Sequence, residues 1–450
     1  MGLRIAASFH LPEQSAPLPA EGRMSQTMNM SEENIEYLKK KLALKSIRVL
    51  LRYRYYEQKE HRDEHFSLTP PWLKGMYQST VGWCAKSVDE LADRLMFLGF
   101  DDGSDIYAVD DIFAANNADV FFDSAIREAL IGSCAFAHIA HGENGDRMPR
   151  LSLLTAKDAT GIIDEQTYLL KEGYAVLDRD KNGRPLVEAY FLPGQTEYRF
   201  ADGSTTIEKS ACRYPLLVPI IYRPSSSRPF GHSRISRSCM YYQQLAENTL
   251  RRAEVTAEFY SFPQKYVSGT DPDMDAMDSW KASISAMLRF DKDADGDKPT
   301  VGQFQQQSMT PYADQIRMAA AMFAGETGLT LDDLGFVSDN PSSADAIKAA
   351  HESLRVISRK AQKNFGNAFA NVGFVAACVR DDMPYSRSLV PDMKAKWEPV
   401  FEPDASMIAT VGDAAIKVNQ TVPNFFNQNN LRDLIGIEGS EPVGIEEVAE

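Results

Sequence analysis

Hydrophobic and polar positions alternate in the first third of the chain with the period of amphipathic helices. The pattern predicts helices over residues 31–60, 81–97 and 113–132, and in the second of these apolar residues recur at every third or fourth position. Residues 1–29 mix Pro, Ser, Gln and Met without any period, so we expect a flexible N-terminal arm there.

The pattern changes between about residues 135 and 222, where short runs alternate apolar and polar residues as strands do. Lys181-Asn182-Gly183 and Ala201-Asp202-Gly203 lie between such runs, and Asn-Gly and Asp-Gly pairs favour tight hairpin turns. We therefore expect an antiparallel sheet flanked by helices, which is an α+β arrangement.

Three long helices are predicted next, over residues 235–262, 310–328 and 343–380, and the segment 401–450 predicts two further short helices. The apolar stripes of the first two long helices consist of Tyr241, Leu245, Leu250, Val255, Phe259 and Phe262, and of Ile316, Ala320, Phe323 and Thr327. A long helix with so narrow a stripe cannot form a core alone, so each needs a neighbour from its own chain or from another copy.

The composition indicates a globular protein without a membrane-spanning segment. A hydrophobic share of 44% with 25% charged residues is that of a folded globular chain. No apolar run approaches the roughly 20 residues that span a bilayer, and the N-terminus lacks the apolar core of a signal peptide, so we expect synthesis in a cytoplasm and no membrane contact. The five scattered cysteines predict reduced thiols and show no zinc-ligand spacing.

Candidate metal sites are weak. Residues 290–298 resemble the start of a calcium loop, with Asp291, Asp293 and Asp295 in register, but Gly302 stands where a bidentate Glu is needed. We therefore prefer an acidic, solvated turn for this segment. His138 and His141 could be two metal ligands, but the alternating pattern around them predicts a strand and supplies no fixed acidic third ligand.

No nucleophile elbow, phosphate-binding loop or dinucleotide motif is present in the sequence, so we expect no enzyme activity, no cofactor and no metal. A metal-dependent hydrolase that uses the two histidines stays open as the alternative, as does a generic scaffold or binding module. Residues 52–56, Arg-Tyr-Arg-Tyr-Tyr, could stack on nucleic-acid bases, or could simply pack along their helix.

The joints between the long helices carry the most distinctive motifs. They are Ala257–Tyr266 (AEFYSFPQKY), Gly328–Gly335 (GLTLDDLG) and Asn340–Ile347 (NPSSADAI), with Leu91–Phe100 (LADRLMFLGF) upstream. In this order they resemble the portal proteins of tailed double-stranded-DNA phages, of the siphovirus type, over roughly residues 30–435. The chain departs from the family pattern at Leu329-Thr330, where a proline is more usual.

The resemblance implies an α+β phage-portal fold: a helical wing carrying an antiparallel β region, a two-helix stem, a small clip, a long wing helix after a tunnel loop, and a short helical crown. The expected parts are the arm (1–29), wing (30–234), first stem helix (235–262), clip (263–309), second stem helix (310–328), tunnel loop (329–342), long wing helix and return (343–400) and crown (401–450).

The resemblance also implies site residues. The channel-lining tunnel loop would contribute Leu331, Asp332, Asp333, Leu334, Phe336, Val337 and Asp339; the stem Arg251, Arg252 and Arg317; and the clip Trp280, Met287, Leu288 and Phe290. The loop aspartates would repel DNA phosphate, and the clip residues would contact other copies and partner proteins. For Arg251 and Arg252, helical ion pairs with nearby glutamates and a ring of arginines in the channel wall both stay open.

As a family member, the chain would form a cyclic homo-oligomer, a dodecamer, at one capsid vertex of the virion after synthesis in the host cytoplasm. Its partners would be the major capsid protein, the terminase large subunit, which would supply ATP hydrolysis, and a head-tail adaptor. Double-stranded DNA would pass through without sequence-specific binding. The net charge of −15 fits this role, because a channel wall that repels phosphate lets DNA slide.

Overall fold

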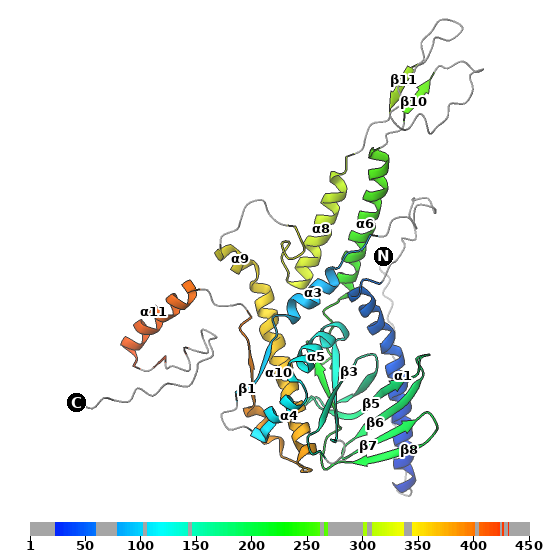
Figure 1. Ribbon diagram of the computed structural model, residues 1–450, viewed down its shortest axis with the longest axis vertical. Coiled ribbons are helices and arrows are strands. Elements are labelled where there is room, and N and C mark those ends of the chain that lie inside the picture. Colours follow the sequence, from blue (N-terminus) through cyan, green and yellow to red (C-terminus); the bar gives the residue numbers. More distant parts are fainter. Residues whose placement is uncertain are drawn as a thin grey trace, which may run out of the picture.

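The computed structural model describes residues 23–59, 79–101, 106–142, 146–261, 265–268, 300–303, 308–336, 344–400, 405–423, 425–426 and 431. Figure 1 shows a body of mixed helices and strands from which a pair of helices projects. The α+β expectation is therefore confirmed at the level of fold class.

Two antiparallel sheets form the middle of the body, of three strands in the order β3-β2-β9 and of five in the order β4-β5-β6-β7-β8. The strands are β2 Cys134–Ala140, β3 Arg150–Thr155, β4 Ala159–Ile163, β5 Leu170–Arg179, β6 Pro185–Leu192, β7 Gln195–Phe200, β8 Thr205–Lys209 and β9 Leu217–Ile221. The predicted turns at residues 181–183 and 201–203 join β5 to β6 and β7 to β8, as expected.

Buried strands and one long helix make the main core. Every residue of β9 is buried, and so is every residue of β2 except the last. Helices α5 (Ala118–Gly132) and α10 (Glu352–Arg380) pack on this small sheet. A Cβ on Gly366 would lie 2.7 Å from the Ala395 Cβ, and one on Gly373 2.5 Å from a Val109 methyl carbon, so these glycines let α10 approach its neighbours closely.

The long N-terminal helix α1 (Arg23–Tyr56) covers the five-stranded sheet. Between them lies a second, smaller hydrophobic cluster, which consists of Ile35, Leu38 and Leu42 from the helix and Tyr174, Val176 and Tyr190 from the sheet. An ion pair of 2.7 Å between the Lys39 Nζ and the Glu188 Oε2 adds a polar link. Helix α1 starts earlier than the predicted residue 31, so its first turns fall in the segment expected to be an arm.

The predicted helix over residues 81–97 is wrong at its C-terminal end. Helix α3 spans only Trp83–Ala92, and β1 (Phe97–Asp101) pairs with β12 (Lys394–Trp397). The Phe97 ring contacts the rings of Phe100, Phe122, Phe369 and Trp397. This long-range aromatic packing overrides the local helical spacing.

The helix predicted over residues 113–132 is two helices, α4 (Val109–Ala115) and α5. Asn117 between them has a φ of 51°, a left-handed conformation that asparagine tolerates and that ends a helix. The helix predicted over residues 343–380 is likewise interrupted, because His351, with φ −88° and ψ 3°, separates α9 (Ala344–Ala350) from α10. Two short 3₁₀ segments, η1 (Ile106–Ala108) and η2 (Arg387–Asp392), complete the body.

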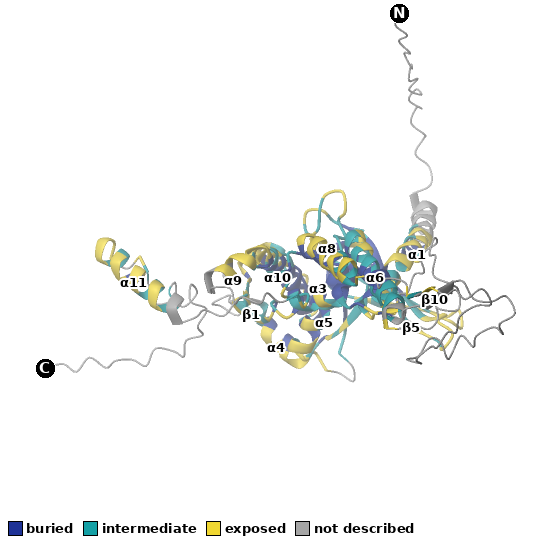
Figure 2. Cartoon of the chain, turned by 90° about the horizontal axis from the view of Figure 1, so that it is seen from above, coloured by how far each residue is buried: buried dark blue, intermediate teal, exposed yellow. Residues whose placement is uncertain are grey.

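Helices α6 (Arg237–Ser261) and α8 (Thr310–Thr327) form the projecting pair, with the hairpin β10 (Lys265–Ser268) and β11 (Thr300–Gln303) beyond its far end. Helix α11 (Ala405–Thr421) stands apart from the body in both views (Figures 1 and 2) and confirms the first short helix predicted for the tail. The second falls mostly outside the described residues. No described helix is long and apolar enough to cross a membrane.

Candidate functional site: the helix pair and the turn after it

Helix α8 packs on α6 and on the body through the stripe that its sequence predicts. Ala320, Phe323 and Thr327 are buried and Ile316 is half-buried. At the far end of the pair, the hydroxyls of Thr256 and Tyr312 lie 2.9 Å apart, which links the two helices.

The buried face of α6 is more polar than predicted. Tyr241, expected in the apolar stripe, is 62% exposed, whereas Gln243 and Glu247 are buried. The Gln243 Oε1 accepts a hydrogen bond of 2.9 Å from the backbone N–H of Cys84, and the Glu247 Oε1 accepts one of 3.4 Å from that of Val81. Cys84 lies in the first turn of α3, where its N–H has no intrahelical acceptor, so Gln243 caps that helix. Val81 precedes the helix, so Glu247 fixes the backbone that leads into it.

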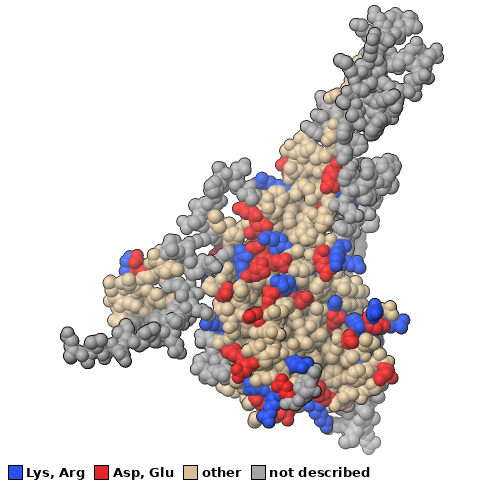
Figure 3. Space-filling view, in the orientation of Figure 1, with Lys and Arg blue, Asp and Glu red and all other residues tan. Residues whose placement is uncertain are grey.

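The other side of α8 is exposed and largely uncharged. Met318 and Met322, one helical turn apart, are 51% and 54% exposed, and Ala321 and Gly325 beside them are exposed too. Figure 3 shows that uncharged side chains cover most of the helix pair in that view, whereas charges of both signs are spread over the body. One copy of the chain leaves this apolar strip in water.

The three predicted stem arginines differ in environment. Arg317 is exposed and makes no ion pair or hydrogen bond with the part of the chain that the structure describes. Arg251 and Arg252 are half-buried, and both interact with other groups of the chain.

The segment after α8 is a single helical turn that is capped at both ends. Gly328, with φ +73°, ends α8. The Thr330 N–H donates to the Asp333 carboxylate at 2.8 Å and the Asp333 N–H donates to the Thr330 hydroxyl at 3.2 Å, the reciprocal pattern of a capping box. Gly335, with φ +89°, closes the turn, with the Phe336 N–H donating to the Leu331 carbonyl and the Gly335 N–H to that of Asp332.

This turn lies on the body. The side chains of Leu331, Leu334 and Phe336 pack against the main core, and the Phe336 ring centroid is 6.5 Å from that of Trp83. Asp333 is mostly buried and Asp332 is exposed. The hydrogen bond to Glu90 raises the pKa of Lys86, and the Asp333 carboxylate adds to this shift.

Several predicted residues cannot be placed. Val337 and Asp339 of the tunnel loop lie outside the described residues. So do the clip residues Trp280, Met287, Leu288 and Phe290, together with the acidic segment 290–298.

The two histidines lie in different environments. His138 is buried on β2, with its Nδ1 3.1 Å from the Ser152 hydroxyl, and burial lowers its pKa from 6.5 to about 4. His141 lies past the end of β2, half-buried and 3.8 Å from Glu208. Within the described residues, no group of three or more His, Cys, Asp or Glu side chains could hold a metal ion.

Of the two interpretations of residues 52–56, the structure supports packing along the helix. Tyr55 is 2% exposed. Tyr53 donates a hydrogen bond to the Glu128 carboxylate, and Tyr56 donates one of 2.8 Å to the Asp89 carboxylate. All three rings pack against the main core.

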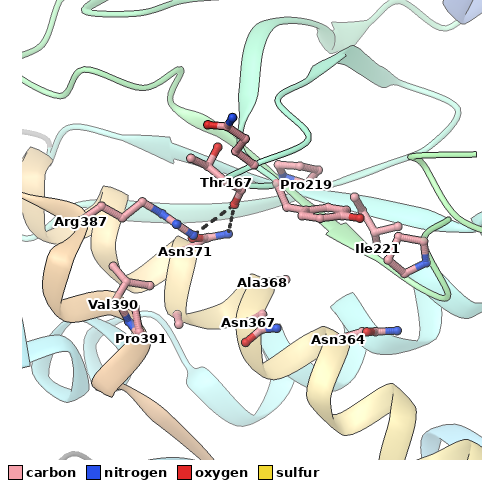
Figure 4. A pocket seen from close by; sticks show the side chains of 14 residues that line it. Thr167, Pro219, Ile221, Asn364, Asn367, Ala368, Asn371, Arg387, Val390 and Pro391 are labelled. Atoms are coloured by element: carbon pink, nitrogen blue, oxygen red, sulfur yellow. Dashed lines mark hydrogen bonds between the residues drawn. The ribbon is translucent and has the colours of Figure 1, made fainter. Parts of the chain in front are cut away.

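A cavity of about 510 Å³ lies between α10, η2 and the β4–β5 connection (Figure 4). The Arg387 guanidinium donates to the Thr167 carbonyl at 3.1 Å and to the Asn371 side-chain oxygen at 2.5 Å, and the Asn371 amide donates to the same carbonyl at 3.3 Å. The Arg387 guanidinium in the wall of the cavity therefore binds acceptors of the protein itself, which indicates a structural role. The sequence did not predict this arrangement.

Comparison with known proteins defines the class, which is that of the phage portal proteins. The chain matches the family described as "Phage portal protein, SPP1 Gp6-like" over residues 35–417, most of its length, and so belongs to this family. The resemblance seen in the helix joints is thus confirmed, and the hydrolase alternative is not favoured. Portal proteins are structural components of the virion.

Two relatives are portal proteins of mycobacteriophages. The chain is 26% identical to that of Mycobacterium phage L5 over 393 residues and 25% identical to that of Mycobacterium phage D29 over 388 residues. Each alignment covers 81% of this chain and 77% of the relative.

Solved structures show a more distant likeness. The neck of a native gene transfer agent (GTA) particle computed with C12 symmetry and the neck of an empty GTA particle computed with C6 symmetry give TM-scores of 0.45 and 0.46. Sequence identity is 11% and 12%, over 80% of this chain and 90% of each matched chain. This similarity is too low to support an argument about the present chain.

Proposed function

We propose that copies of this chain form a ring-shaped channel, a dodecamer, at one capsid vertex, through which the genome is packaged and ejected. Family membership supports the role. The proposal that the copies form a ring rests mainly on the exposed strip of Met318, Ala321, Met322 and Gly325 on the projecting helix pair. In a closed ring of heterologous contacts, a neighbouring copy would cover this strip.

The parts of the ring follow from the same proposal. Helices α6 and α8 form the stem, and residues 329–342 form the tunnel loop at the narrowest point of the channel. Residues 30–234 and 343–400 form the wing, 263–309 the clip and 401–450 the crown. The packing of Leu331, Leu334 and Phe336 on the body supports a loop whose first half is anchored, leaving exposed Asp332 to repel phosphate.

The clip is the proposed docking site for the terminase large subunit during packaging and for the head-tail adaptor afterwards, and the wing is the proposed contact with the major capsid protein. Under this proposal the chain is made in the host cytoplasm and the ring becomes part of the virion. Exposed Arg317 directly precedes Met318, the first residue of the proposed interface strip, so its charge would lie close to a neighbouring copy.

Charged substitutions in the strip test the ring. Met318→Lys with Met322→Lys should remove the ring at micromolar protein concentration, because each interface would bury unpaired cations, and every 1.4 kcal/mol of this cost weakens an interface about tenfold. Mass by light scattering is the measurement. The matched control is Leu186→Lys with Ile207→Lys, two exposed apolar residues of the five-stranded sheet.

Rings of full size from the Met318/Met322 variant would contradict the proposed interface. A control variant that loses the ring equally would show that added charge alone prevents assembly.

A further inference from the structure

Four stretches of at least 20 residues in this acidic chain contain no acidic residue, namely 37–56, 65–88, 209–246 and 353–380, and the first and third carry the most cations. Residues 37–56, within α1, carry seven cations: Lys39, Lys40, Lys41, Lys45, Arg48, Arg52 and Arg54. Residues 209–246 carry six: Lys209, Arg213, Arg223, Arg228, Arg234 and Arg237. In a chain of net charge −15, such stretches call for a physical explanation.

The fold brings these two stretches together. Lys41, Lys45, Arg48 and Arg52 recur at steps of four, three and four residues, so they form a row along one side of α1 about 16 Å long. The loop after β9 lies beside this row, since the Lys41 Nζ is 4.7 Å from the centre of the Phe230 ring.

The loop holds a further cation in place. Backbone hydrogen bonds of 3.2 and 2.9 Å join Ser225 and Arg228 in both directions. Gly231, with φ +72°, closes the loop against β9, where a Cβ would lie 2.1 Å from the Tyr222 carbonyl oxygen. Arg228 is exposed on this fixed loop, next to the exposed hydroxyls of Ser226 and Ser227.

We define the cationic face as Lys41, Lys45, Arg48, Arg52 and Arg228. Across the residues that the structure describes, none of the five forms an ion pair with a carboxylate. Lys41 and Arg52 instead donate to the backbone carbonyls of Gly161 at 2.7 Å and Gly132 at 2.9 Å, which fixes them without neutralising their charge.

The five cations also repel one another. Burial lowers the pKa of Arg52, and the nearby Arg48 and Arg228 lower it further. Burial lowers the pKa of Lys41 as well, and Lys45 adds to that shift. The fold therefore keeps partly desolvated like charges together with no paired carboxylate among the residues that the structure describes, which is unfavourable unless an external anion binds.

We propose that the cationic face binds the phosphates of double-stranded DNA, without sequence preference, on the outer surface of the molecule. The choice of DNA rests on the proposed function, since DNA is the polyanion that a portal handles. The chemistry favours phosphate over an acidic protein surface because the cations form a regular row that is flanked by serine hydroxyls, and arginine and serine are common phosphate ligands. The exposed Leu44 and Ile47 of α1 lie outside this row.

Covalently closed circular DNA separates this surface from the channel, because a closed circle has no end to thread. We would measure its binding to the full chain between 50 and 200 mM salt, with the mass of each sample checked by light scattering. Lys45→Gln, Arg48→Gln and Arg228→Gln together remove exposed cations only. Affinity at 100 mM salt should fall at least about tenfold, and the slope of log K against log salt should flatten by about 0.9 for each phosphate that the variant no longer neutralises.

The matched control is Lys360→Gln, Lys363→Gln and Lys394→Gln, the same charge change on exposed residues of α10 and β12. Equal loss of affinity in both triple variants, or no loss in either, would overturn the proposal. So would binding of a poly-glutamate peptide, but not of the circle, to the wild type, because the face would then belong to an acidic protein. Failure to form a ring would contradict the proposed function and would be seen separately in the mass.

Discussion

His138 shows how one buried side chain adds a pH dependence to the stability of the body. Its ring lies on β2, 5.3 Å from the ring of Phe191, and burial holds its pKa near 4 instead of 6.5. The folded chain therefore keeps this histidine neutral under conditions in which the unfolded chain would protonate it.

Between pH 6.5 and pH 4 the unfolded state binds more protons at this position, so folding stability falls as the pH is lowered through this range. From pH 7 to pH 5 the loss from His138 should be about 2 kcal/mol. Urea unfolding of His138→Gln should show a correspondingly smaller pH dependence than the wild type.

His141→Gln is the control, since that side chain is half-exposed. If the two variants and the wild type lose equal stability between pH 7 and pH 5, the account of His138 as a buried neutral group fails.

Among the elements, the capped turn at residues 330–336 bears most directly on the proposed function. Asp333, which family resemblance assigns to the channel lining, accepts a backbone hydrogen bond inside the turn, whereas Asp332 is exposed. The two neighbouring aspartates thus lie in different environments: Asp333 fixes the backbone of the turn, whereas under the proposed function Asp332 would repel phosphate.

Alanine substitutions of the two aspartates should therefore change the free energy of unfolding by different amounts. Asp333→Ala should lower the free energy of unfolding by about 1 kcal/mol through loss of the cap, while Asp332→Ala should change it by less than about 0.5 kcal/mol. Urea denaturation at fixed protein concentration is the measurement. Equal effects of the two substitutions would be inconsistent with the capping role of Asp333.

Local signals in the sequence predicted the elements that depend on local physics. The hairpins at Asn182-Gly183 and Asp202-Gly203 need only turn residues with the right backbone preference, and the buried stripe of α8 needs only its own periodicity. The pairing of β1 with β12 could not be predicted, because Trp397, the strand partner of Phe97, lies near the other end of the chain and the spacing of Phe97 continues that of a helix.

The same contrast holds for the candidate sites. The residues of the capping box, Thr330 and Asp333, and the glycine at 335 are visible in the sequence, whereas the family resemblance points only to a channel role for the aspartate. The contacts of Gln243 and Glu247 with the start of α3 and the segment before it left no signal, since polar residues one turn apart resemble a solvated face. The cationic face did leave one, the absence of acidic residues from two separate stretches, but only the fold brings those stretches together.

At the scale of the whole molecule, a single copy of the chain leaves apolar surface exposed on two of its elements. The helix pair projects with an uncovered strip, and α11 stands apart from the body with most of its residues exposed (Figure 2). An isolated chain leaves this apolar surface in water, whereas neighbouring copies in a ring would bury it.

The most direct test of the ring is the mass of the full chain in solution, measured by light scattering on a sizing column and followed by negative-stain images of the peak. The account predicts a particle of about 600 kDa, twelve copies of a 50.2 kDa chain, with a stain-filled central hole. A compact particle of one or two chains at every protein concentration would contradict it.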